Sequence, residues 1–127
     1  MAKYRIAVVN SSSFGQVFKE HWQALEKIGE VKRFMLPTDI DGKSLAEKLQ
    51  GFNVVVASVT PNFNQEFFDN KDELLLISRH GIGYNNVDLA AAKAHGTKVT
   101  IVSPLVERNA VAENALANLM ALVRQTV

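Results

Sequence analysis

Two patterns of apolar and polar positions alternate along this chain. Five short apolar runs are typical of strands buried on both faces, and between them apolar residues recur every three or four positions, as in helices. The predicted strands cover residues 4–10, 31–36, 54–57, 74–78 and 98–102. The second run is more mixed in polarity and suits an edge strand, whereas the third is fully apolar and suits a central one. This alternation predicts an α/β fold, with one parallel sheet and helices on both of its faces.

The predicted helices lie between these strands, over residues 14–28, 44–49, 65–68 and 88–95. We expect Ser11–Ser13 to cap the first helix and Gly29 to end it. Its aromatic residues fall at helical spacing, which places them in the core: Phe14, Phe18 and Trp22. Asn64 is expected to cap the third helix, and Asp88 heads an Ala-rich fourth helix that Gly96 closes.

A long last helix is predicted from an N-cap at Asn109 to Gln125. Its apolar residues cover more than one side, whereas a surface helix normally keeps one side polar. Two interpretations follow: the helix is the central packing helix of the domain, or part of its apolar surface waits for a partner chain or a further domain. Glu113 would lie in the first turn, where a carboxylate favours the helix dipole.

Composition narrows the possible functions. The 127 residues are 47% hydrophobic and 21% charged, which suits one compact domain. The net charge of +1 and the absence of a Lys/Arg cluster argue against nucleic acid. The lack of cysteine excludes disulfides, thiolate catalysis and Cys-ligated zinc, and no His/Asp/Glu spacing suggests a metal. Without a signal peptide or a bilayer-spanning segment, we expect a cytoplasmic protein that does not bind membranes.

The most informative segment runs from Ser78 to Asp88 and holds two glycines, Gly81 and Gly83. These glycines follow the fourth predicted strand. In an open parallel sheet this edge binds ligands, because the loops there leave a crevice and expose backbone N–H groups. His80 would add a cation beside an anion, although histidines next to glycine turns are often merely exposed. Arg79 could likewise aid binding of a carboxylate, but its place beside an exposed loop favours the interpretation as a solvated surface residue.

Two sequence motifs resemble the D-isomer-specific 2-hydroxyacid dehydrogenases. Residues 75–88, LLISRHGIGYNNVD, with the following AAAK and Gly96, are similar to the loop of that family's N-terminal substrate domain. Residues 109–116, NAVAENAL, are similar to its interdomain helix. The resemblance implies a flavodoxin-like five-stranded parallel sheet with helices on both faces, ending in a long interdomain helix. It divides the chain into a substrate domain, 1–108, and an interdomain helix, 109–127, that leads to an absent NAD-binding Rossmann domain.

The resemblance also implies particular roles for residues of the loop. The amides of Ile82 and Gly83 would hold the carboxylate of a 2-hydroxy or 2-oxo acid, with Gly81 allowing close approach and His80 beside them. Ile82, together with Val111 at the start of the last helix, would lie near the nicotinamide of NAD. The chain departs from the family at Asn85, where Asp is usual, and at Asn114, where many members have His. Asn85 can still brace the turn through an Asx hydrogen bond.

The catalytic Arg, Glu and His of the family and its dinucleotide fingerprint follow the interdomain helix, so none of them lies in this chain. Residues 81–86 lack the third glycine of that fingerprint. The resemblance therefore implies that this chain is the substrate-binding half of an NAD-dependent oxidoreductase that interconverts a D-2-hydroxy acid and its 2-oxo acid. The chain alone is expected to be inactive, and the parent protein is expected to be a homodimer. The alternative is a non-enzymatic module or regulatory fragment that binds small carboxylates through the same loop.

Overall fold

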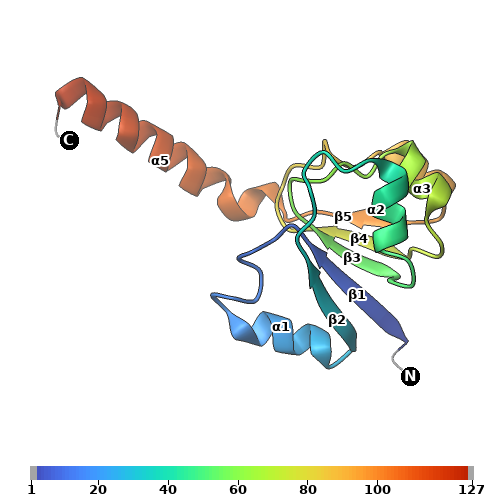
Figure 1. The fold of residues 1–127 in the computed structure, drawn as a ribbon. Coiled ribbons are helices and arrows are strands. Elements are labelled where there is room, and N and C mark those ends of the chain that lie inside the picture. Colours follow the sequence, from blue (N-terminus) through green and yellow to red (C-terminus); the bar gives the residue numbers. More distant parts are fainter. Residues whose placement is uncertain (1–2, 126–127) are drawn as a thin grey trace.

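The computed structural model describes residues 3–125, which form a parallel sheet flanked by helices and followed by one long helix (Figure 1). The strands are β1 (Tyr4–Val9), β2 (Gly29–Phe34), β3 (Val54–Ala57), β4 (Leu76–Arg79) and β5 (Lys98–Thr100). Their order in the sheet is β2-β1-β3-β4-β5, and all four neighbouring pairs are parallel. The predicted α/β fold with a five-stranded parallel sheet is confirmed.

The central strands are the most apolar ones. Ile6 of β1 is aligned with Val31 of β2 on one side and with Val54 of β3 on the other. The last four residues of β1 and the last three of β3 are buried, whereas no residue of β2 is more than partly buried. The sequence-based placement of 31–36 at an edge and of 54–57 at the centre is therefore correct, because an edge strand keeps water on one side.

One face of the sheet carries the main core. It is covered by α2 (Gly42–Lys48), α3 (Gln65–Asn70) and α4 (Leu89–Ala94), whose apolar residues pack in one cluster with Val55 and Ile77 of the sheet. Phe67 lies at its centre, with its ring edge-on to those of Phe63 and Phe68 at centroid distances of 5.0 and 5.1 Å. Edge-to-face packing is the favourable geometry for such rings, and it holds α3 against the segment that precedes it.

Each of these three short helices begins at a side-chain cap. Asp41, Asn64 and Asp88 accept hydrogen bonds from the amides of Ser44, Phe67 and Ala91 at 2.9–3.0 Å. Caps of this kind satisfy amides that the helix itself leaves free. The amide and hydroxyl of Ser44 also hold the pKa of Asp41 below its ordinary value. The predicted cap at Asn64 is confirmed, and Asp88, expected to head the fourth helix, caps α4.

The opposite face of the sheet is covered by α1 (Lys19–Glu26), which is shorter than expected. Gly15, with φ at +74°, interrupts the apolar periodicity, and the Arg33 guanidinium donates to the carbonyls of Ser11 and Phe14. Residues 11–17 therefore form a loop, so the prediction that Ser11–Ser13 cap a helix is wrong. Gly29 likewise begins β2 instead of ending the helix.

The aromatic residues of this region are not core residues as predicted. Phe18 is 57% exposed at the N-cap of α1, while Phe14 and Trp22 are half-buried at the margin of a small cluster around Ile6. Buried residues are absent from α1, which leaves this face of the sheet thinly covered. The helix is thus an amphipathic cover, not a second core layer.

The last helix, α5 (Pro104–Arg124), begins five residues before the predicted N-cap at Asn109. Ser103 caps it by accepting from the amide of Leu105, and Pro104 fits the first turn because its missing N–H needs no partner there. Glu113 consequently lies in the helix interior and not in the first turn. The predicted boundary between 108 and 109 falls inside α5.

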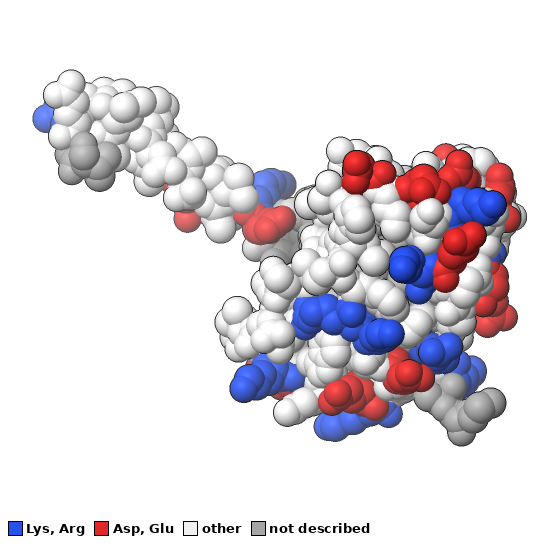
Figure 2. Space-filling model, in the orientation of Figure 1, with Lys and Arg blue, Asp and Glu red and all other residues white. Residues whose placement is uncertain are grey.

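No residue of α5 is buried, and the helix projects away from the sheet (Figure 1). Most of its visible surface carries no charge (Figure 2). The interpretation of this helix as the central packing helix of the domain is therefore wrong. Its apolar surface is instead presented to solvent.

We predict that Phe67→Ala lowers the free energy of unfolding by about 3–5 kcal/mol, because it empties a fully buried site that the neighbouring rings cannot fill. Phe18→Ala is the matched control, since the same atoms are removed from an exposed position, and we expect a loss below about 1 kcal/mol. Urea denaturation of both variants measures the difference. Equal losses would contradict the assignment of the core.

Candidate functional site

The loop between β4 and α4 lies where the carboxyl ends of the central strands meet. The amide of His80 donates to the carbonyl of Ala57 at the end of β3, at 2.7 Å. The carbonyl of Gly81 accepts from the amide of Val102, just before α5, at 2.9 Å. The loop is thus fixed to β3 on one side and to the segment that leads into α5 on the other.

Within residues 3–125, the amides of Ile82 and Gly83 donate no hydrogen bond to a protein acceptor. Gly83 is exposed and Ile82 is half-buried. Successive free backbone N–H groups in a turn form a concave site for an anion. The predicted carboxylate loop therefore has the free donors that such binding requires.

Asn86 holds the back of this loop in place. Its side-chain amide donates to the carbonyls of Ser58 and Pro61, at 3.0 and 3.1 Å, and the loop backbone pairs with Phe63 through the Asn86 carbonyl and the Asp88 amide. Asn85, whose side chain is predicted to brace the turn, is exposed and makes no side-chain hydrogen bond within residues 3–125. The bracing residue is its neighbour, whose burial could not be read from the sequence.

Arg79 is buried, contrary to its interpretation as a solvated surface residue. It is only 5% exposed, its Nη1 donates to the carbonyl of His80 at 2.9 Å, and its Nε has no partner. Within the described chain no carboxylate pairs with it, and burial lowers the pKa of its guanidinium below the ordinary value. A charge this poorly solvated raises the positive potential of the adjoining loop.

Gly81 allows the guanidinium to lie against the loop. Its φ is +151°, and a Cβ at this position would lie 2.9 Å from Nη1 of Arg79. At Gly83 the nearest atom to such a Cβ would be Oδ1 of Asn85, at 3.6 Å. Glycine is therefore favoured at position 81 by its positive φ together with the close guanidinium, whereas a Cβ at position 83 would make only an ordinary van der Waals contact.

His80 is oriented by the loop that follows β1. Its Nδ1 lies 3.2 Å from Oγ of Ser11, and its ring is edge-on to Phe14 at a centroid distance of 5.4 Å. Ser11 is buried, and its Oγ also accepts from the amide of Phe14. The sequence predicts a helix cap at Ser11 and does not reveal this contact, because the two residues are 69 positions apart. His80 remains exposed, with Nε2 free to meet a ligand.

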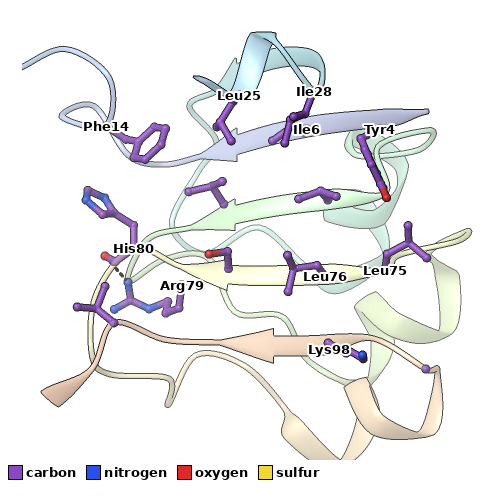
Figure 3. Close-up of a pocket in the computed structure, with 15 residues that line it drawn as sticks. Tyr4, Ile6, Phe14, Leu25, Ile28, Leu75, Leu76, Arg79, His80 and Lys98 are labelled. Carbon is purple, nitrogen blue, oxygen red and sulfur yellow. Dashed lines mark hydrogen bonds between the residues drawn. The ribbon is translucent and has the colours of Figure 1, made fainter. Parts of the chain in front are cut away.

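A cavity of about 760 Å³ opens beside these residues on the thinly covered face of the sheet (Figure 3). Most of its lining is apolar and comes from β1, β3, β4 and the end of α1. Arg79 and His80 lie at the end of this cavity nearest Phe14, and Lys98 lies on β5 toward the other end (Figure 3). The loop therefore borders an apolar cavity whose lining includes the basic side chains of Arg79, His80 and Lys98.

Val111, predicted to lie near a cofactor, is 62% exposed on the projecting helix α5. His80, Gly81, Ile82 and Gly83 lie together in one loop, whereas Val111 lies apart from them on α5. Any shared ligand would have to bridge the loop and the helix.

The described residues do not fit a dinucleotide. Position 86 holds Asn in place of the third glycine of the fingerprint, and its side chain is committed to Ser58 and Pro61. The N-terminus of α4, where a pyrophosphate would lie, is capped by the carboxylate of Asp88. Residues 3–125 also contain neither a cluster of metal-ligating side chains nor a helix long and apolar enough to cross a bilayer.

Comparison with known proteins gives a family match over almost the whole chain. The model described as "D-isomer specific 2-hydroxyacid dehydrogenase, catalytic domain" matches residues 3–125. Among curated proteins, the glyoxylate reductase of Pyrococcus furiosus is 32% identical over 103 residues, which are 81% of this chain and 30% of that protein. The chain thus spans about a third or less of the curated relatives it matches.

Solved structures agree in fold. The apo structure of D-lactate dehydrogenase from Escherichia coli is 28% identical with a TM-score of 0.72, covering 96% of this chain and 38% of that one. The pyruvate reductase of Chlamydomonas reinhardtii is 26% identical with a TM-score of 0.74, covering 98% and 36%. These structures therefore contain a unit similar to this chain within a longer polypeptide.

We predict that Gly81→Ala destabilises the fold by more than about 1 kcal/mol, because a side chain there meets both an unfavourable φ and the Arg79 guanidinium. Gly83→Ala is the control: its Cβ has room, and we expect a change within about 1 kcal/mol of zero. Thermal and urea unfolding of the two variants measure the effect. A larger loss at position 83 than at 81 would contradict this account of the loop.

Proposed function

The chain belongs to the D-isomer specific 2-hydroxyacid dehydrogenase family, and from this membership we propose that it is the substrate-binding part of an NAD-dependent oxidoreductase that interconverts a D-2-hydroxy acid and its 2-oxo acid. The observation that carries the proposal is the pair of free amides at Ile82 and Gly83, in the loop where the family motif lies. Both oxygens of a carboxylate can accept from such a pair.

The charges around the loop favour an anionic ligand. Arg79 contributes a buried, unpaired positive charge behind Gly81, and His80 offers Nε2 from a ring that Ser11 and Phe14 orient. Neither side chain is neutralised by an acidic neighbour within the described chain. We propose that the carboxylate binds to the two amides, that His80 lies beside it, and that Arg79 acts on it through the field of its charge.

The acid–base and redox steps belong to residues outside this chain. Hydride transfer requires a pocket that holds the reactive carbon of a cofactor against the substrate, and the described residues do not fit a dinucleotide. We propose that a domain following α5 binds NAD and supplies the proton donor, with Ile82 and Val111 on its side of the cleft. The 127-residue chain alone is then expected to bind the acid without reducing it.

The names of the relatives suggest the first acids to test. One is a glyoxylate reductase, and the similar solved structures include a D-lactate dehydrogenase and a pyruvate reductase. Glyoxylate and pyruvate are short 2-oxo acids with one carboxylate, which suits a site built from one pair of amides. We therefore propose short, unphosphorylated 2-oxo acids as ligands of the loop.

In an NMR titration of the ¹⁵N-labelled chain with glyoxylate and then pyruvate, we predict the largest amide shifts at Ile82 and Gly83, with dissociation constants on the order of millimolar. His80→Ala is expected to weaken binding severalfold, because it removes a donor beside the carboxylate. His95→Ala is the control, since His95 is exposed and its side chain contacts Asp69 and the ring of Phe68 on another surface. Shifts that avoid residues 81–84, or equal losses in both variants, would contradict the site.

A further prediction concerns the natural reading frame beyond Val127. We expect it to continue into a Gly-x-Gly-x-x-Gly motif and then an Arg, a Glu and a His, and the encoded protein to oxidise NADH with glyoxylate or pyruvate. In that protein, Gly83→Pro removes one of the two amide donors and should lower kcat/KM by on the order of a hundredfold. A longer protein that binds the acids in the titration but never oxidises NADH would instead support a carboxylate-binding module.

A further inference from the structure

The hydroxyl group of Ser11 is buried and has few partners. Ser11 is 4% exposed, and within residues 3–125 its Oγ makes two hydrogen-bond contacts, with the amide of Phe14 at 3.3 Å and with Nδ1 of His80 at 3.2 Å. The Phe14 amide can only donate, so it occupies one lone pair of Oγ. The hydroxyl proton of Ser11 is left with Nδ1 of His80 as its acceptor, since a buried donor without a partner costs free energy.

This contact has a direct consequence for the imidazole ring of His80. In a neutral imidazole one nitrogen carries the proton and the other is an acceptor. When Nδ1 accepts from Ser11, the ring proton lies on Nε2. His80 is exposed, and its Nε2 makes no hydrogen bond within the described chain. A neutral His80 therefore offers an N–H donor to a ligand.

Ser11 is itself held in place by Arg33 of β2. The Arg33 guanidinium donates from Nη1 to the carbonyl of Ser11 and from Nη2 to the carbonyl of Phe14. It also lies over the ring of Trp22, 4.7 Å from the ring centroid. One planar group thus fixes both ends of the turn that contains the Ser11 hydroxyl, as expected of a forked donor. The position of Oγ is therefore set before His80 meets it.

The ring of Phe14 limits how His80 can turn. It lies edge-on to His80, with 5.4 Å between the ring centroids and 78° between the ring planes (Figure 3). This is a favourable geometry for a pair of flat rings. A half-turn of the imidazole about its Cβ–Cγ bond would place a carbon atom beside Ser11 and lose the hydrogen bond. The buried hydroxyl would then have no acceptor within the described residues, so the observed orientation is favoured.

From these contacts we propose that Ser11 is a positioning residue of the candidate site. Its hydroxyl donates to Nδ1 of His80, holds the neutral ring in the tautomer protonated at Nε2, and so makes Nε2 a donor for an oxygen of the bound acid. Ser11 acts through His80 and not by touching the acid. A ligand group at Nε2 must be an acceptor, such as a carboxylate or keto oxygen, whereas an ammonium group would find no partner there. The part played in binding rests on the proposed function, but the tautomer is measurable without a ligand.

The first measurement determines the tautomer. Two-bond ¹H–¹⁵N correlation spectra of the 127-residue chain at about pH 8.5, where histidine rings are ordinarily neutral, distinguish a protonated ring nitrogen from an unprotonated one. We expect the His80 ring to carry its proton on Nε2 alone. His21 is the reference for a ring that averages between tautomers, because its nitrogens make no side-chain hydrogen bond within the described chain.

Three variants test whether Ser11 sets this tautomer. In Ser11→Ala the ring signals of His80 should move toward the averaged values of His21, whereas Ser11→Thr keeps a hydroxyl and should keep the Nε2 tautomer. Ser12→Ala is the matched control, since Ser12 is an exposed neighbour whose hydroxyl makes no hydrogen bond within residues 3–125. Protonation of His80 at Nδ1 in the unaltered chain, or ring signals that Ser11→Ala leaves unchanged, would overturn the proposal.

The second measurement tests the route of action by titration with glyoxylate. Ser11→Ala should raise the dissociation constant by about two- to threefold, less than His80→Ala does, because the donor remains but is no longer fixed. The double variant S11A/H80A should bind no more weakly than His80→Ala alone, since Ser11 acts through His80. Losses that simply add would show a separate structural effect of Ser11 and overturn the proposal. If glyoxylate leaves the amides of Ile82 and Gly83 unchanged, the proposed function fails, and the tautomer spectra still decide the role of Ser11.

Discussion

The parallel pairing of β1, β3 and β4 is the constraint on which the site depends. Because these strands run in the same direction, the segments that follow them emerge at one edge of the sheet: Ser11 after β1, Ser58 after β3 and His80 after β4. Residues far apart in sequence thereby come within hydrogen-bonding distance. The contacts of Ser11 with His80 and of Asn86 with Ser58 exist only through this topology.

Asn10 shows how closely the edge is tied together. Its backbone has a φ of +54°, its amide donates to the carbonyl of Phe34, and its side chain bonds to Leu36 and Thr60. One residue thus joins the ends of β1, β2 and β3. This junction fixes the start of the loop that follows β1, which contains Ser11. Because Ser11 contacts Nδ1 of His80, the ring of His80 is oriented although the residue is exposed.

The buried charge of Arg79 gives the site its electrostatic character. Burial of a guanidinium without a carboxylate costs free energy, and the partial compensation seen here is a single hydrogen bond to the His80 carbonyl. An anion bound at the amides of Ile82 and Gly83 would offset part of that cost, while the exposed loop still allows it to leave. A surface arginine in the same position would be screened by water and would add little.

The sequence predicted features that depend on local chemistry and missed those that depend on tertiary contacts. The five strands, the edge position of 31–36 and the caps at Asn64 and Asp88 follow from apolar runs and side-chain type alone. The start of the first helix was wrong because the Arg33 guanidinium holds residues 11–14 in a loop, a contact from another strand. The burial of Arg79 and the bracing by Asn86 were missed for the same reason: the space and the acceptors come from distant segments.

Helix α5 shows why apolar composition alone cannot place a helix. Its side chains satisfy the composition of a core helix, and the expected N-cap at Asn109 would have started it five residues later than Pro104. Ser103 and Pro104 instead start the helix directly after the segment in which Val102 donates to the carbonyl of Gly81. The loop that carries the candidate site is therefore hydrogen-bonded to the segment from which α5 begins, and the start of the helix depends on this local chemistry and not on the apolar composition that follows.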